Sequence, residues 1–181
     1  MSDIKAVCVF CGASNNVPSH FLDIGKTFGN MLVQNNIQLV YGGGDCGIMG
    51  AVANSVLKAK GYVTGVFPRS LKDLESEHAS LSEIIMVESM HERKRIMFER
   101  SDAIVVLPGG FGTMDEMFEI ITWKQLRFHQ KKIIILNHKG YWDTLIHLMN
   151  NIIDVGFARE EVRSFYQVVD TPEGVIDALK G

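Results

Sequence analysis

The sequence is poor in cysteine and has no excess of positive charge. Its three cysteines are too few, and odd in number, for a disulfide framework. The 18 lysines and arginines are outnumbered by 21 aspartates and glutamates, which gives a formal net charge of −3. Since no run of Lys and Arg is long enough to form a basic surface, we expect no partnership with nucleic acid or with a membrane.

The amino-terminal residues lack the features of a targeting or membrane segment. MSDIKAVCVFCG enters a strand-like run without a charged leader, a long apolar segment or a small-residue cleavage site. From this absence we expect a cytoplasmic protein.

Motifs for metal and redox chemistry are also missing. The histidines are scattered, and neither H-E-x-x-H nor a paired C-x-x-C is present, so we expect no metal. Cys8 and Cys11 do form a single C-x-x-C. A redox pair needs its thiols at the start of a helix, whereas these lie in or just after a predicted strand. We therefore interpret both cysteines as small buried apolar side chains.

The pattern that is present is an alternation of short β-branched runs with longer helical stretches. Such an alternation is typical of βαβ units around a parallel sheet. The predicted strands cover residues 4–10, 37–41, 62–67, 83–87, 103–107, 133–137 and 165–169. The predicted helices cover residues 20–34, 48–60, 90–100, 113–128, 141–155 and 172–179. We expect an α/β fold: one Rossmann-like, doubly wound domain over residues 1–181, with a mainly parallel sheet of about seven strands flanked by helices.

Three of the predicted strand ends are followed by unusual loops. These loops read FCGASNN, GGGDCGIMG and PGGFGTMDE. Ligands of doubly wound sheets bind outside the carboxyl ends of the strands, so we expect the three loops to form one ligand site. The long irregular segment at residues 68–82 also follows a strand, and a loop of that length is more often functional than idle.

The PGGFGT loop is suited to hold a phosphate. Gly109, Gly110 and Gly112 expose backbone amides and permit close approach, and the start of a helix adds the positive end of its dipole. Thr113 adds a hydroxyl, and Ser14 of the first loop could donate a further hydrogen bond. The lysine of a P-loop is missing, so ATP hydrolysis of that kind is not expected. A tight turn that holds nothing is the structural alternative.

The second loop contains a dinucleotide-type motif. Gly42, Gly44 and Gly47 match G-x-G-x-x-G between a strand and a helix. The motif also requires an acid at the end of the next strand, where this chain has FPR at 67–69, and it belongs to the first strand of a fold rather than the second. A dinucleotide-dependent oxidoreductase is therefore a weak alternative.

Glu116 admits two interpretations. Its spacing from Thr113 fits a capping box, in which the two residues satisfy the first amides of a helix. A carboxylate about one sugar's length from a phosphate could instead stabilise an oxocarbenium-like transition state or handle a water molecule.

The surroundings of Arg93 can be predicted from the start of a second helix. Ser89 and Glu92 form another capping-box pattern, which predicts that a helix begins near Met90. Arg93 then lies on one stripe with Met90 and Met97, in apolar surroundings where a guanidinium needs an anion. The alternative is that Arg93 extends to solvent or pairs with a structural acid.

These segments resemble a known family. PGGFGTMDE at 108–116 closely resembles the PGGxGTxxE signature of the LOG-type (Lonely guy) phosphoribohydrolases, and MHERK at 90–94 resembles their M-H-x-R-K signature. The similarity extends through FCGAS at 10–14, GGGDCGIMG at 42–50 and ITWKQLRFHQKK at 121–132. The resemblance implies hydrolysis of the N-glycosidic bond of a nucleoside 5'-monophosphate, with AMP or an N6-substituted (cytokinin) AMP as substrate. It also implies a homodimer and no cofactor.

The resemblance assigns roles to individual residues. It implies that Arg93 and Glu116 are the catalytic pair. The implied substrate-binding residues are Ser14, Gly43, Gly44, Glu75, Met90, Lys94, Gly109, Gly110, Phe111, Gly112, Thr113, Met114, Asp115 and Thr122. Asp115 stands where the family often has glutamate, which leaves the preferred base open.

Two other functions remain to be considered. A nucleotide-binding sensor or carrier would use the same loops without catalysis. Similar sequences have also been labelled lysine decarboxylases, but a pyridoxal enzyme needs a Schiff-base lysine with a partner for the ring nitrogen, and the sequence offers no such constellation.

Overall fold

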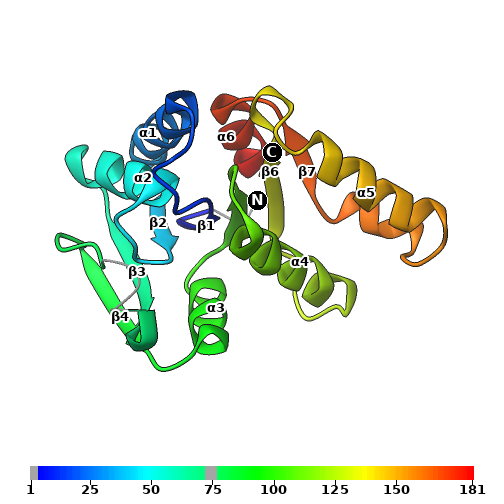
Figure 1. Ribbon diagram of the computed structural model, residues 1–181, viewed down its shortest axis with the longest axis horizontal. Coiled ribbons are helices and arrows are strands. Elements are labelled where there is room, and N and C mark those ends of the chain that lie inside the picture. Colours follow the sequence, from blue (N-terminus) through cyan, green and yellow to red (C-terminus); the bar gives the residue numbers. More distant parts are fainter. Residues whose placement is uncertain (1–3, 72–76) are drawn as a thin grey trace.

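The computed structural model describes residues 4–71 and 77–181. Its centre is a seven-stranded sheet in the order β4-β3-β2-β1-β5-β6-β7, and all neighbouring strands are parallel (Figure 1). The strands are β1 (Ala6–Phe10), β2 (Gln38–Tyr41), β3 (Val63–Pro68), β4 (Glu83–Val87), β5 (Ala103–Val106), β6 (Lys132–Leu136) and β7 (Gln167–Val169). The predicted parallel sheet is confirmed, and the observed strand ends lie within two residues of the predicted ones.

Helices cover both faces of the sheet. They are α1 (Ser19–Gln34), α2 (Gly47–Lys58), α3 (Met90–Glu99), α4 (Phe111–Gln125), α5 (Asp143–Asp154) and α6 (Pro172–Lys180). One apolar cluster joins α1, α2 and α6 to the sheet and includes Leu32 and Val52. The other joins α3, α4 and α5 to the opposite face and includes Met97 and Met117. The predicted double winding is therefore confirmed. In the described part of the chain no helix is both long and apolar enough to cross a membrane.

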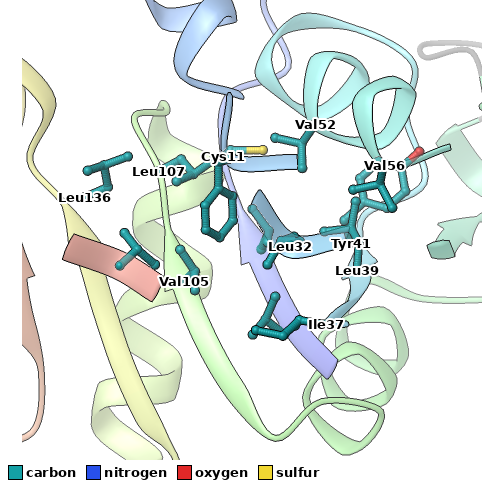
Figure 2. Close-up of a cluster of buried hydrophobic side chains, with 14 of the residues drawn as sticks. Cys11, Leu32, Ile37, Leu39, Tyr41, Val52, Val56, Val105, Leu107 and Leu136 are labelled. Carbon is teal, nitrogen blue, oxygen red and sulfur yellow. The ribbon is translucent and has the colours of Figure 1, made fainter. Parts of the chain in front are cut away.

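The two cysteines of the C-x-x-C lie in different clusters. Cys11 belongs to the cluster that also holds Val52 and Leu107 (Figure 2), whereas Cys8 belongs to the cluster on the other face. Burial raises the pKa of both thiols above the ordinary value. The interpretation of these cysteines as buried apolar side chains is confirmed.

The start of α4 differs from the prediction. The helix begins at Phe111, and its N-cap is Gly110, which has extended backbone (φ −101°, ψ −153°) and no side chain to bond the first amides. Thr113 and Glu116 therefore both lie inside the helix, and the predicted capping box between them is wrong. An added Cβ atom would meet nothing at Gly110 or Gly112, so this end of the helix is open.

The predicted cap of α3 is confirmed. Ser89 is the N-cap, and its hydroxyl accepts a hydrogen bond from the Glu92 amide at 3.1 Å. The Glu92 carboxylate accepts from the Glu88 amide, one residue before the cap, rather than from Ser89 itself. This start fixes the rotation of α3, which buries Arg93 and leaves Arg95 at the surface.

Candidate active site

The site lies where the winding of the sheet changes direction. The chain moves from β1 toward β2, β3 and β4, and later from β5 toward β6 and β7, so the loops after β1 and β5 leave their neighbouring strand ends in opposite directions. The Gly12 amide donates to the Pro108 carbonyl at 3.0 Å, and the Ile48 amide donates to the Gly12 carbonyl at 2.9 Å. The three glycine-containing loops thus meet, as predicted, around a cavity of about 460 Å³.

The loop after β5 forms one wall of this cavity. A Cβ atom on Gly109 would overlap the Thr113 hydroxyl and approach the Gly12 amide nitrogen to 2.9 Å, so only glycine fits where the two loops touch. Gly110 and Gly112 have open space around them and leave the start of α4 accessible. Because the first amides of a helix have no partner within it, this wall offers N–H donors and a positive dipole to an anion.

Arg93 occupies the space that the glycines after β2 leave free. Its Nη2 donates to the Gly42 carbonyl at 3.1 Å and its Nη1 lies 3.9 Å from Glu116 Oε1, while its buried Nε has no hydrogen-bond partner among the described residues. The anion that the buried guanidinium requires is therefore Glu116. A Cβ atom on Gly42 would overlap Nη2. The first glycine of the dinucleotide-type motif thus accommodates an arginine.

Glu116 faces Arg93 from α4 and is only 9% exposed. Burial raises the pKa of its carboxyl to about 7, against the opposing effect of the Arg93 guanidinium and with a smaller upward contribution from Asp115. The guanidinium does not prevail because it lies beyond hydrogen-bond distance. Near neutral pH this carboxyl is therefore able to gain or lose a proton, as an acid-base or charge-stabilising group must.

We expect the buried carboxyl of Glu116 to lower the stability of the fold at alkaline pH. Because its pKa rises from 4.5 to about 7 on folding, its stabilising contribution is complete below about pH 4.5 and is lost as the pH rises through about 7. Glu116→Gln mimics the protonated acid, so relative to wild type it should gain about 2.5 kcal/mol of unfolding free energy between pH 5 and pH 8. Urea unfolding at both pH values checks this, and an equal difference at the two would contradict it.

The structure brings most of the predicted site residues together. Those that line the cavity are Ser14, Met90, Arg93, Gly109, Gly110, Gly112, Thr113, Asp115 and Glu116. The described residues of the predicted set that do not line it are Gly43, Gly44, Lys94, Phe111, Met114 and Thr122. Glu75 lies outside the described residues.

Lys94 lies beside the cavity and pairs with two acidic residues of α4. Its ammonium is 3.1 Å from Asp115 and 2.8 Å from Glu119, so it binds α3 to α4 beside the cavity. No lysine in the described ranges 4–71 and 77–181 lines the cavity, so the donors at the start of α4 are backbone amides.

An apolar wall was not anticipated from the sequence. It consists of Val17, Phe21, Ile48, Met49 and Tyr141. The Tyr141 hydroxyl donates to the Gly109 carbonyl at 2.6 Å, and its ring meets Phe21 edge-on at 5.2 Å between centroids. These residues come from the loop before α1, from α1 and α2, and from the segment before α5, and no shared sequence pattern marks them. Only the GIMG segment, which supplies Ile48 and Met49, was within a loop singled out beforehand.

Comparisons with known proteins identify the family. A family model described as "Possible lysine decarboxylase" matches residues 49–179. The probable cytokinin riboside 5'-monophosphate phosphoribohydrolase LOGL1 of Oryza sativa subsp. japonica is 42% identical over 92% of this chain and 74% of its own length. The cytokinin riboside 5'-monophosphate phosphoribohydrolase LOG3 of Arabidopsis thaliana is 37% identical over 99% of this chain and 83% of its own length. The chain belongs to the LOG family.

Several solved structures have the same fold as this LOG-family chain. The molybdenum cofactor binding protein of Rippkaea orientalis has a TM-score of 0.74 at 18% identity and covers 99% of this chain and 98% of its own. The molybdenum cofactor carrier protein of Chlamydomonas reinhardtii has a TM-score of 0.72 at 17% identity, over 97% and 95% of the two chains. At these identities the match shows a shared fold and nothing about the ligand.

The site of this LOG-family chain does not suit the chemistry in the family model's description. A pyridoxal-dependent decarboxylase forms a Schiff base with a lysine. Among the described residues no lysine lines the cavity, and Lys94 beside it is engaged by two carboxylates.

Proposed function

We propose that this protein hydrolyses the N-glycosidic bond of a purine or cytokinin nucleoside 5'-monophosphate, AMP or an N6-substituted AMP, to a free base and ribose 5-phosphate. The observation that carries the proposal is the placement of the buried Glu116, paired with Arg93, one helical turn from the open start of α4. Glu116 is four positions after Gly112, which is about 6 Å along a helix axis and similar to the span of a pentose. The printed functions of the curated relatives support the same reaction.

The proposed mechanism begins with the phosphate. The first amides of α4 and the Thr113 hydroxyl bind the 5'-phosphate, which fixes the anomeric carbon beside Glu116. The bond from this carbon to the base nitrogen breaks, and its electron pair leaves with the base. Glu116, when ionised, stabilises the positive charge that develops on the ribose and orients the attacking water. The water oxygen bonds to the anomeric carbon, and its proton passes to Glu116 and on to the departed base.

Arg93 supports this step from behind the carboxylate. Its charge favours the ionised form of Glu116. The apolar wall that contains Phe21 and Tyr141 lies on the same cavity and is suited to the planar base.

A chromatographic assay of substrate turnover tests the proposed activity. We expect incubation with AMP or isopentenyladenosine monophosphate to release the free base and ribose 5-phosphate in equal amounts. The matching nucleosides should be turned over far more slowly, because they lack the phosphate that the α4 amides bind. Tight binding of the nucleotides without release of base would support the sensor or carrier function instead. A rise in melting temperature with NAD(P) alone would favour the oxidoreductase.

We further propose that the protein is a single nucleotide-binding domain that works as a cytoplasmic homodimer. Phe111 begins α4 and Phe128 lies three residues beyond its end; 88% and 73% of their surfaces are exposed, so both could be covered by a second subunit. Light scattering at micromolar concentration measures the oligomeric state, and cell fractionation tests the compartment.

A further inference from the structure

The turn after β2 needs support from outside itself. This glycine turn (residues 42–44) consists of three glycines, which have no side chains to pack, and Gly43 has a φ of +81°. Glycine reaches such a conformation easily but has more alternatives to it than any other residue. The Gly42 carbonyl must nevertheless stay 3.1 Å from Arg93 Nη2 to hold the guanidinium. Contacts from other segments must therefore fix the turn.

The chain at Glu77 and His78 supplies the backbone part of this support. The His78 amide donates to the Gly43 carbonyl at 2.9 Å. Gly44 and Glu77 form an antiparallel bridge. This segment comes after β3 and thus runs along the glycine turn from a distant part of the sequence.

The His78 side chain ties the segment to α2 and to the residue that follows the turn. Its Nδ1 accepts a hydrogen bond from the Ser80 amide at 3.2 Å, which assigns the ring proton to Nε2. Nε2 then donates to Asn54 Oδ1 at 3.1 Å and lies 3.5 Å from Asp45 Oδ1. The Asn54 amide also donates to Asp45 Oδ1, at 3.1 Å. The ring is 6% exposed, although Asn54 and Asp45 are at the surface.

We propose that His78 is a positioning residue for the reaction. Its ring holds the glycine turn in one conformation. The Gly42 carbonyl of that turn then fixes the position of the Arg93 guanidinium through the hydrogen bond from Nη2. His78 itself does not line the cavity and touches no reacting group. The proposal rests on the proposed function in one respect, namely that Arg93 and Glu116 act together on a nucleoside 5'-monophosphate.

Two substitutions distinguish the contribution of the His78 ring's shape from that of its hydrogen bonds. His78→Phe keeps a ring of similar size without either nitrogen, and His78→Gln restores a donor to Asn54 at about the position of Nε2. We expect kcat of the Phe variant, per folded enzyme, to fall on the order of 10-fold to 100-fold with KM within about threefold, because a small displacement of Arg93 misaligns the pair. The Gln variant should recover most of the loss. His147→Phe, on the exposed face of α5, is the matched control and should leave kcat unchanged.

A second measurement does not depend on turnover. Hydrogen exchange of the backbone amide at position 78, which bonds the Gly43 carbonyl, should be at least about 10-fold faster in the Phe variant and near wild type in the Gln variant. If the wild-type protein cleaves no nucleotide, the proposed function fails, and this exchange pattern still tests whether the ring holds the turn. The proposal for His78 is overturned if exchange is the same in all three proteins, if the Gln variant recovers nothing, or if the Phe variant loses melting temperature while kcat stays within twofold of wild type.

Discussion

Glu116→Gln is expected to lower kcat for release of adenine from AMP about 1,000-fold, with little change in KM. Glutamine keeps the size and polarity of the side chain but cannot carry the negative charge that the developing ribose cation requires. The loss of one such preorganised electrostatic group typically costs about 10²–10³ in kcat, and loss of proton handling adds to it. The measurement is steady-state kinetics by chromatography, and kcat is calculated from the concentration of folded enzyme.

The matched control for this variant is Glu99→Gln. Glu99 lies on the exposed end of α3, where its carboxylate pairs with Arg95, so the same chemical change there should leave kcat within twofold of wild type. If Glu116→Gln retained wild-type kcat, the assignment of the catalytic carboxylate would be wrong, whatever the identity of the preferred base.

Gly42→Ala is expected to lower kcat about 100-fold although Gly42 lies outside the cavity wall. The added methyl group would overlap Arg93 Nη2, so the guanidinium must give up the Gly42 carbonyl and move relative to Glu116. A displacement of about 1 Å in a catalytic group can cost a factor of about 100. Kinetics with AMP measures the effect, and far-UV circular dichroism shows whether the fold is kept.

A double-mutant cycle tests the cause of this loss. In an Arg93→Ala background the clash is absent, so Gly42→Ala should cost little further activity, and the two effects should be strongly non-additive. Arg95→Ala, two residues away on the solvent side of α3, serves as the matched background in which the full loss from Gly42→Ala should persist. Additive losses in both backgrounds would show that Gly42 acts by another route.

Local patterns predicted the fold because each strand and helix is long enough to show its period. The strands at 83–87 and 103–107 were recognisable as apolar, β-branched runs. Because helices separate successive strands along the chain, each strand was expected to lie parallel to its neighbours in the sheet, which are β3 for the first and β1 and β6 for the second. The serine cap at Ser89 was predicted correctly because a serine hydroxyl can reach the third amide of the helix, although the Glu92 carboxylate bonds the Glu88 amide and not that of Ser89. The equivalent pattern at Thr113 failed because the helix already begins at Phe111, so that Thr113 lies inside it and not at its N-cap.

The individual residues of the candidate site could be predicted from the sequence, but the contacts between them could not. An arginine on an apolar helical stripe indicated that an anion was needed, and the structure supplies Glu116 at 3.9 Å. The glycines after β2, in contrast, matched a dinucleotide motif, and nothing local distinguished a bound phosphate from a neighbouring side chain. The deciding contact joins Arg93 to Gly42, 51 residues away in the sequence.

The sequence by itself determined the doubly wound sheet, the loop of free amides at the start of α4, and the need of Arg93 for an anion. These depend on residue type and spacing over a few turns of chain, where sterics and hydrogen bonding are local. Only the tertiary structure decided that Glu116 faces Arg93 instead of capping its helix, that the glycine turn makes room for a guanidinium, and that Tyr141 and Phe21 close one wall. Those outcomes require segments distant in the chain to be packed at the change of winding between β1 and β5, and that packing is set by the whole core.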